Sequence, residues 1–288
     1  MSAPAARDSQ LDDRTPIRRR WWLEVTYVLL FYAVYSTIRN QFGSGGSFSA
    51  GSATALRNAE LVIDIERALG LYVELDIQSA FIDWEWFIKG WNIFYGSLHF
   101  VVTGGVMIWM YRRTPNRYRR YRNVLSATTA LALVGFSAFP LMPPRLLNAG
   151  GEYGANLAAH DYVDTLAEIG GLWSFDSGTM QSISNQWAAM PSLHIGWALW
   201  CTLALFPVLP NRWSRILVVF YPMTTLFAII VTGNHYWMDA VGGALTLTVG
   251  WYLGNWASRW ISPKIEPALE LPPDAHNDDD PAKPRSSA

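Results

Sequence analysis

Two short polar stretches of the sequence carry residue types that could move a phosphoryl group. The first, residues 188–194, ends in His194, and the second, residues 232–239, contains His235 and Asp239. His235 and Asp239 are four positions apart, so on a helix they lie on one face, one turn from each other. A carboxylate placed there accepts the Nδ1–H of the imidazole and leaves Nε2 to act as nucleophile or base. His194 is then available to protonate a leaving oxygen.

A phosphate held at these histidines also needs groups that offset its negative charge. Arginine, hydroxyl and amide side chains suit that task, as do the backbone N–H groups at helix N-termini. The candidates near the two stretches are Arg145, Ser192, Thr232 and Asn234. We predict that these four residues bind the phosphate.

A third group of polar residues lies within an apolar run. Asn92, Tyr95 and His99 are spaced three and four positions apart, which predicts a polar stripe on the inner face of a helix. One interpretation is that the stripe forms a wall of the pocket for the substrate's headgroup. The other is that His99, which lies deeper than the other two histidines, is a buried histidine with hydrogen-bond partners.

Two rival sites would use the same residues. His194, His235 and Asp239 could form a metal site of two histidines and one carboxylate. However, Asp239 lies one turn deeper than His235, which suits orienting the histidine better than sharing a metal. No carboxylate cluster accompanies the site, so we predict no metal and no cofactor. A transporter is the other alternative, but transporters place their sites near mid-depth, whereas these residues fall at one rim.

The composition indicates a membrane protein. Of 288 residues, 51% are hydrophobic and only 16% are charged, against an average of about 25% charged in soluble domains. The net charge of −1 gives no argument for a nucleic-acid partner. Six apolar runs approach the ~20 residues needed to cross a bilayer: residues 21–38, 90–111, 124–141, 191–210, 216–231 and 236–256. We therefore predict an all-α, polytopic fold with a bundle of six transmembrane helices.

The arginines predict how such a bundle is oriented. Arginine-rich residues 1–20 and 112–122 belong on the cytoplasmic side by the positive-inside rule, which makes both termini cytoplasmic in a cell membrane. Arg145, His194 and His235 then all fall at the extracytoplasmic ends of their helices. Residues 55–83 mix apolar and charged side chains, so we expect an amphipathic helix there that lies at the membrane surface or caps the bundle. The expected domains are thus a disordered N-terminus (1–20), a membrane domain (21–260) and a disordered tail (261–288).

These motifs resemble a known family. Ala-Met-Pro-Ser-Leu-His at 189–194 and His-Tyr-Trp-Met-Asp-Ala-Val-Gly-Gly at 235–243 resemble the type-2 phosphatidic acid phosphatase superfamily. They look most like the branch that contains inositol phosphorylceramide synthases and their bacterial relatives. The resemblance covers roughly residues 22–258 and includes Pro140-x-x-Pro-Pro-Arg145 and Asn185, which joins the predicted substrate pocket.

The resemblance implies a six-helix membrane enzyme that works through a phosphohistidine. In it His235 is the nucleophile, Asp239 orients His235, His194 is the general acid, and Arg145 ends the first phosphate-binding motif. The substrate would be a lipid that carries a phosphate ester. Hydrolysis and transfer share the first half-reaction, so the motifs leave both open, with a preference for moving an inositol-type phosphate between lipids. The motifs say nothing of the oligomeric state.

Two positions depart from the wider superfamily. Ile229 stands where an arginine precedes the second histidine, and Ala138 stands where a lysine precedes the first-motif arginine. The inositol-phosphate branch also lacks that third-motif arginine. The contacts to the phosphate oxygens would then come from the remaining candidates, Ser192, Thr232 and Asn234, and from backbone N–H groups.

Overall fold

The computed structural model describes residues 21–41, 51–148, 161–171 and 185–260, and these segments consist of helices joined by turns and short loops. The described part contains no strand, only an isolated bridge between Leu141 and Ala188. The helices are α1 (Trp21–Gln41), α2 (Ser52–Ala68), α3 (Glu74–Phe81), α4 (Glu85–Ile93), α5 (His99–Arg113), α6 (Pro115–Ala138), α7 (Thr165–Glu168), α9 (Leu193–Leu205), α10 (Arg212–Val231) and α11 (Trp237–Trp260). A π-helical turn (Phe94–Leu98) joins α4 to α5, and a 3-10 turn covers Pro144–Leu146. The all-α prediction is confirmed for these segments.

Three helices of the described chain are long and apolar enough to cross a membrane. They are α1, the continuous run Glu85–Arg113 that contains α4 and α5, and α10. The helix α9 is apolar but shorter. Three of the six predicted spans therefore have helices that meet both criteria, and the chain has the character of a membrane protein.

The prediction of a single amphipathic helix over residues 55–83 is wrong. The segment forms two helices, α2 and α3, because Gly70 adopts a positive φ of 69° that ends the first. The Gly70 N–H bonds to the Arg67 carbonyl and the Leu71 N–H to the Glu66 carbonyl, which is a Schellman-type helix end. Most of the arginine-rich run belongs to α6, since Pro115 starts this helix and residues 117–122 are helical.

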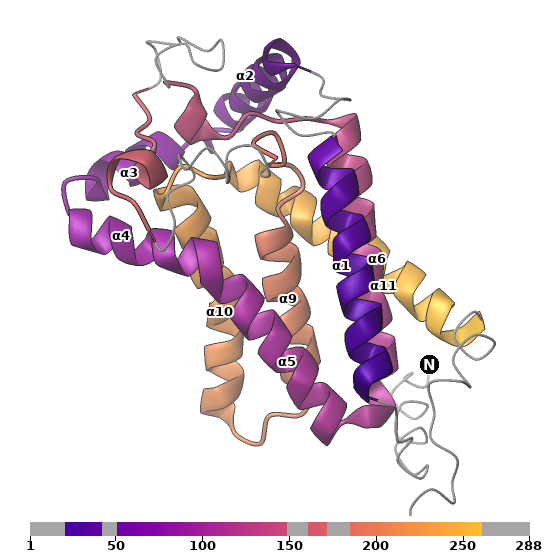
Figure 1. The fold of residues 1–288 in the computed structure, drawn as a ribbon. Coiled ribbons are helices and arrows are strands. Elements are labelled where there is room, and N and C mark those ends of the chain that lie inside the picture. The colour runs from indigo at the N-terminus through magenta and orange to yellow at the C-terminus, as the bar shows by residue number, and fades with distance from the viewer. Residues whose placement is uncertain (1–20, 42–50, 149–160, 172–184, 261–288) are drawn as a thin grey trace, which may run out of the picture.

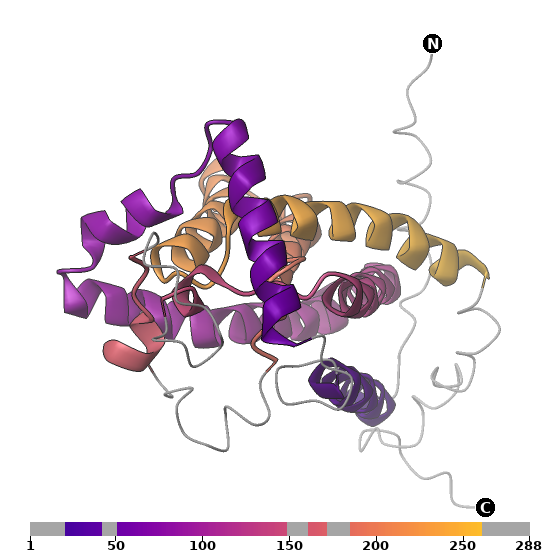
Figure 2. The ribbon, with the colours of Figure 1, turned by 90° about the horizontal axis from the view of Figure 1, so that it is seen from above.

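The long helices form a bundle with α2 across one end (Figures 1 and 2). The helix α9 packs against α5, α10 and α11, and α1 lies beside α6. A buried cluster between α5, α6, α9 and α11 is centred on Met110, Trp200 and Leu247. At one end Arg122 of α6 donates a hydrogen bond of 2.7 Å to the buried carboxylate of Glu24 in α1.

Glycines let α11 lie directly on α6. A Cβ atom on Gly250 would come 2.3 Å from Thr128 Oγ1, and one on Gly254 would come 2.4 Å from Val124 Cα. Both distances are far shorter than side-chain contacts allow, so the two backbones approach as closely as the small-residue pattern of membrane helices permits. This packing aligns the arginine-rich start of α6 with the C-terminal end of α11.

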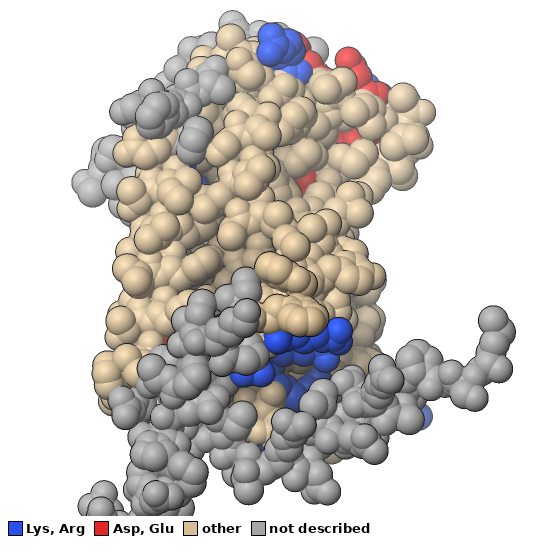
Figure 3. All heavy atoms as spheres, turned by 90° about the vertical axis from the view of Figure 1, so that its right-hand side faces the viewer, with Lys and Arg blue, Asp and Glu red and all other residues tan. Residues whose placement is uncertain are grey.

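Charged side chains lie mostly at the two ends of the face that Figure 3 shows. Blue arginine and lysine side chains gather at the lower end, blue and red side chains occur together at the upper end, and a broad, nearly uncharged band lies between the two ends. The long helices also expose apolar side chains, among them Leu29, Val101, Leu217 and Leu245. An uncharged band with side chains of this kind is what a helical bundle presents to hydrocarbon.

Candidate active site

Backbone hydrogen bonds join three separated stretches of the chain at the upper end of the bundle. The Arg145 N–H donates to the Gly233 carbonyl at 2.8 Å, and the Ser192 N–H donates to the Asp239 carbonyl at 3.0 Å. Gly233 has a φ of 66°, and a Cβ atom there would lie 2.8 Å from Gln78 Nε2. The turn therefore requires glycine, both for its conformation and for its close approach to neighbouring residues.

The two histidines from the motifs lie next to each other. His235 Nδ1 is 3.1 Å from Asp239 Oδ2, and the imidazole is only 3% exposed. The same carboxylate oxygen accepts the Tyr236 N–H at 3.0 Å, which holds it in place. The ring centroids of His194 and His235 are 5.4 Å apart, so both rings can contact a single phosphate group.

Tyr95 and His99 pack against this pair. The Tyr95 ring stacks on His194 with a centroid distance of 4.4 Å, and the His99 ring lies 4.2 Å from His194. His99 Nδ1 is 3.0 Å from the Tyr95 carbonyl, next to the π-helical turn Phe94–Leu98. Turns of this kind displace side chains from the regular helical register and are frequent at functional sites. His99 thus has a hydrogen-bond partner, as its interpretation as a buried histidine requires. It also borders His194, as its interpretation as part of the pocket wall requires.

Arg145 is buried and held by three side chains. Its Nε donates to Asn234 Oδ1 at 3.1 Å, Nη1 to Asp164 Oδ2 at 2.5 Å, and Nη2 to Gln186 Oε1 at 2.5 Å. Thr232 accepts from Asn234 Nδ2 at 2.8 Å, so it positions the amide that faces the arginine. A guanidinium fixed in this way keeps its orientation without a ligand.

Ser192 differs from the other candidates because its hydroxyl has no partner. The residue is fully buried, and Oγ makes no hydrogen bond to any residue that the structure describes. Asp239 Oδ1 is buried and unpartnered in the same sense. A buried hydroxyl without a partner carries a desolvation cost that a bound oxygen can offset.

A comparison with family models identifies the chain's relatives. The model described as the PAP2 superfamily matches residues 60–253, which contain every candidate catalytic residue. The chain belongs to the PAP2 superfamily. Searches of curated proteins and of solved structures gave no significant match. PAP2 proteins are generally phosphatase-like enzymes, so membership makes a lipid-type phosphate ester the expected class of substrate.

Two glutamates that sequence reasoning missed hold the start of α11 in this PAP2 protein. The first-turn N–H groups of Trp237 and Met238 donate to Glu74 Oε1 at 2.9 Å and to Glu66 Oε1 at 3.0 Å. These N–H groups have no partner within a helix, so carboxylates from α2 and α3 cap the helix that carries Asp239.

The two capping glutamates lie against each other, and burial affects them strongly. Burial raises the pKa of Glu66 to about 9, the negative charge of Glu74 adds to the rise, and the hydrogen bond from Met238 opposes it. Glu66 Oε2 is buried and has no donor among the described residues. A proton on Glu66 would let this oxygen donate to Glu74 in place of two repelling charges.

Two predicted pocket residues brace the site from outside. Asn92 Nδ2 donates to the carbonyls of Thr165 and Gly170, both at 2.8 Å, and Thr165 Oγ1 donates to the Thr232 carbonyl at 3.1 Å. Asn185 Nδ2 donates to the Arg39 carbonyl at the end of α1 at 3.1 Å. The described contacts therefore connect both asparagines to the surrounding backbone and not to the histidines.

Asp164 and Gln186, like the glutamates, were not among the predicted site residues. Asp164 carried one signal in the sequence, since it precedes α7 and accepts the N–H groups of Leu166 and Ala167 as a helix cap. Nothing in the sequence pairs either residue with Arg145. In the described segments, no group of three or more His, Cys, Asp or Glu side chains is placed to hold a metal ion.

Proposed function

We propose that this PAP2 protein cleaves the phosphate ester of a lipid by transferring the phosphoryl group to His235. The observation that carries the proposal is the joint placement of His235, bonded to Asp239, and His194, with Arg145 hydrogen-bonded to the same turn. No part of this mechanism needs a metal ion.

In the first half-reaction His235 Nε2 attacks the phosphorus atom and a P–N bond forms. The bond from phosphorus to the lipid's oxygen breaks, and that oxygen takes a proton from the imidazolium of His194. Asp239 accepts the Nδ1–H of His235 and stabilises the positive charge that the ring acquires. The developing charge on the phosphoryl oxygens is met by Arg145, Ser192, Asn234 and the first N–H groups of α9.

In the second half-reaction an acceptor hydroxyl attacks the phosphohistidine. His194, now neutral, removes the acceptor's proton, the P–N bond breaks, and its electron pair returns to His235. Water as acceptor releases inorganic phosphate, whereas an alcohol acceptor gives a new phosphate ester. Both histidines end in their starting protonation states.

The motifs favour an alcohol acceptor. Because the motifs at 189–194 and 235–243 resemble the branch that contains inositol phosphorylceramide synthases and their bacterial relatives, we propose inositolphosphotransferase chemistry ahead of simple dephosphorylation. Asn92, Tyr95, His99 and Asn185 are proposed to shape the pocket for the headgroup. Of these, Tyr95 and His99 have the stronger support, because they contact His194 directly.

We further propose that the protein spans a cell membrane six times, with α6, α9 and α11 as crossings in addition to the three long apolar helices. Residues 1–20 and 261–288 are then cytoplasmic extensions of a 21–260 membrane domain, and the site faces the extracytoplasmic side. The arginine-rich start of α6 lies at the opposite end of the bundle from the site (Figure 1), which supports this orientation.

Incubating the purified protein with a panel of radiolabelled phospholipids that includes an inositol phospholipid, with and without added alcohol acceptors, tests the proposal. Label transfer that depends on the acceptor indicates a transferase, and release of free phosphate alone indicates a phosphatase. His235→Ala is expected to abolish both reactions while the protein still elutes as a folded species. Turnover close to wild type in that variant would overturn the mechanism. Loss of wild-type activity in excess chelator, restored by adding a divalent ion, would overturn it as well.

A further inference from the structure

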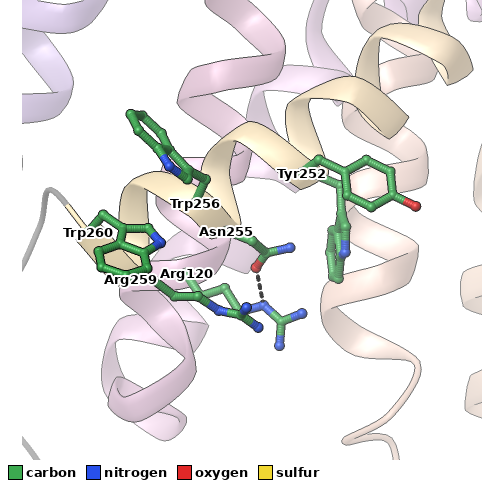
Figure 4. A pocket seen from close by; sticks show the side chains of 7 residues that line it. Arg120, Tyr252, Asn255, Trp256, Arg259 and Trp260 are labelled. Atoms are coloured by element: carbon green, nitrogen blue, oxygen red, sulfur yellow. Dashed lines mark hydrogen bonds between the residues drawn. The ribbon is translucent and has the colours of Figure 1, made fainter. Parts of the chain in front are cut away.

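A second site lies at the opposite end of α11 from His235. A cavity of about 360 Å³ opens between the start of α6 and the end of α11. It is lined by Arg120, Trp251, Tyr252, Asn255, Trp256, Arg259 and Trp260, and none of these is acidic. Both arginine side chains extend beneath Asn255 (Figure 4).

The cavity is partly organised by contacts within the protein. Arg120 Nε donates to Asn255 Oδ1 at 2.5 Å, and its guanidinium carbon lies 4.9 Å from the centre of the Trp251 ring. Both of these contacts are with neutral groups, an amide and an aromatic ring. Arg259 from the next turn of α11 adds a second guanidinium to the same wall. Planar guanidinium groups bind phosphate oxygens in pairs, so the cavity has the chemistry of a phosphate site.

The surface that leads to the cavity is suited to hydrocarbon. Large apolar side chains are exposed along one face of α11 at intervals of three or four residues, namely Val241, Leu245, Val249, Tyr252, Trp256 and Trp260. This stripe runs along the uncharged band and ends at the two arginines, where tryptophans are typical of a membrane–water boundary. A free phosphate ion would use only the arginines, whereas a lipid would use the arginines and the stripe together.

We propose that this cavity binds the phosphate headgroup of an anionic phospholipid whose acyl chains lie along the α11 stripe. In the proposed topology the lipid belongs to the cytoplasmic leaflet. The proposal does not depend on the phosphotransfer reaction, because the cavity shares no residue with the candidate active site.

Native mass spectrometry of the delipidated full chain in detergent tests this site. Phosphatidylglycerol, phosphatidylcholine with the same chains, and inorganic phosphate are titrated separately. We expect preferential binding of phosphatidylglycerol, a loss of about fivefold in its affinity for Arg259→Gln, and about thirtyfold for the pair Arg120→Gln and Arg259→Gln. Arg259 is exposed, so its single variant tests the site even if the double variant folds poorly.

Arg212→Gln is the matched control. Arg212 also lies over a tryptophan ring, 4.8 Å from the centroid of Trp213, but does not line the cavity. It is expected to keep wild-type affinity. Equal affinity for the two lipids, an equal loss in Arg212→Gln, or no loss in Arg259→Gln would overturn the proposal. Displacement of the lipid by low concentrations of inorganic phosphate would show a simple anion site and would overturn it as well.

Discussion

At the scale of single residues, the site contains side chains that have hydrogen-bond partners within the protein and a side chain that has none among the described residues. Arg145, His235 and Asn234 have partners of defined geometry, whereas Ser192 Oγ is buried and has none among the described residues. Removing a paired group disturbs its partner as well as the reaction. Removing an unpaired one isolates its contribution to binding the substrate.

Ser192→Ala is therefore expected to reduce activity without reducing stability. A hydrogen bond to a charged group contributes roughly 1.5–3 kcal/mol, so kcat/KM should fall by about tenfold to a hundredfold. The melting temperature should stay the same or rise, because the variant removes a buried hydroxyl that has no partner. Ser137→Ala is the control, since the Ser137 hydroxyl donates to the Leu133 carbonyl and lies outside the site. A fall in melting temperature with unchanged kinetics would contradict the assigned role.

Asp239→Asn tests the negative charge beside the nucleophile. Because Oδ2 bonds both the Tyr236 N–H and His235 Nδ1, an amide oxygen in its place keeps both hydrogen bonds but loses the charge that stabilises the positive ring of the phosphohistidine. We expect kcat to fall by about 10²–10⁴-fold with a normal circular dichroism spectrum. Asp83→Asn, which changes an exposed acid, should leave kcat unchanged. A kcat within a few-fold of wild type in Asp239→Asn would show that His235 does not need the carboxylate.

At the scale of helices, the sequence predicts features that depend on neighbouring residues, such as helices and short motifs. It does not predict contacts between residues that are far apart in the sequence. Apolar runs predicted an all-α chain, and short motifs selected His194, His235 and Asp239, because both signals are local. The caps on α11 join residues 163 and 172 positions apart, so no local pattern reveals that Glu74 and Glu66 reach it. The same reason hid Asp164 and Gln186 beside Arg145. The break at Gly70 was visible as a glycine, but the amphipathic pattern on both sides concealed it.

The Glu66 cap makes stability depend on pH in a defined direction. The pKa of Glu66 is about 9 in the folded protein and near 4.5 when unfolded, so the folded state binds more protons between these values. Stability from this group is full below pH 4.5 and declines as pH rises toward 9. Glu66→Gln keeps an acceptor for the Met238 N–H and never ionises. We expect its melting temperature to match wild type near pH 5 and to exceed it at pH 9.

Glu60→Gln provides the matched control for that measurement, because Glu60 lies on the same helix and is exposed. Its melting temperature should follow the wild-type curve across the pH range. Parallel curves for Glu66→Gln and wild type would show that Glu66 does not change its protonation on unfolding.

The contact between α6 and α11 is expected to tolerate no added side chain. Gly254→Ala places a methyl group against the Val124 backbone, and overpacking of this kind costs about 1–3 kcal/mol. Thermal unfolding in detergent should show a clear fall in melting temperature. Gly104→Ala is the control, since a Cβ atom there meets nothing within 4 Å and alanine favours the helix. Equal melting temperatures for the two variants would mean that the helices are not packed this closely.

At the scale of the whole molecule, the orientation of the bundle in the membrane decides which compartment each proposed site faces. The candidate active site and the Arg120 cavity lie at opposite ends of α11, whose 24 residues rise about 36 Å. That length is sufficient to cross the hydrocarbon core of a bilayer. Cys201 is the one cysteine in the chain and is buried, so Cys201→Ala provides a background for labelling introduced cysteines.

In that background we expect an impermeant thiol reagent to label intact cells in an alternating pattern. Cysteines replacing the exposed residues Asp83 and Asn148 should react, because both lie at the end that carries the site. Cysteines replacing Arg113, Arg212 and Trp260 should react only after the membrane is permeabilised. Reaction at Asn148 with protection at Arg113 and Arg212 requires α6 and α9 to cross the bilayer. The turn before α11 is hydrogen-bonded to Arg145 and therefore lies at the Asn148 end, so protection at Trp260 requires α11 to cross as well. Labelling of Trp260→Cys together with Asp83→Cys in intact cells would leave α11 on one side and remove the basis for a six-span enzyme with an extracytoplasmic site.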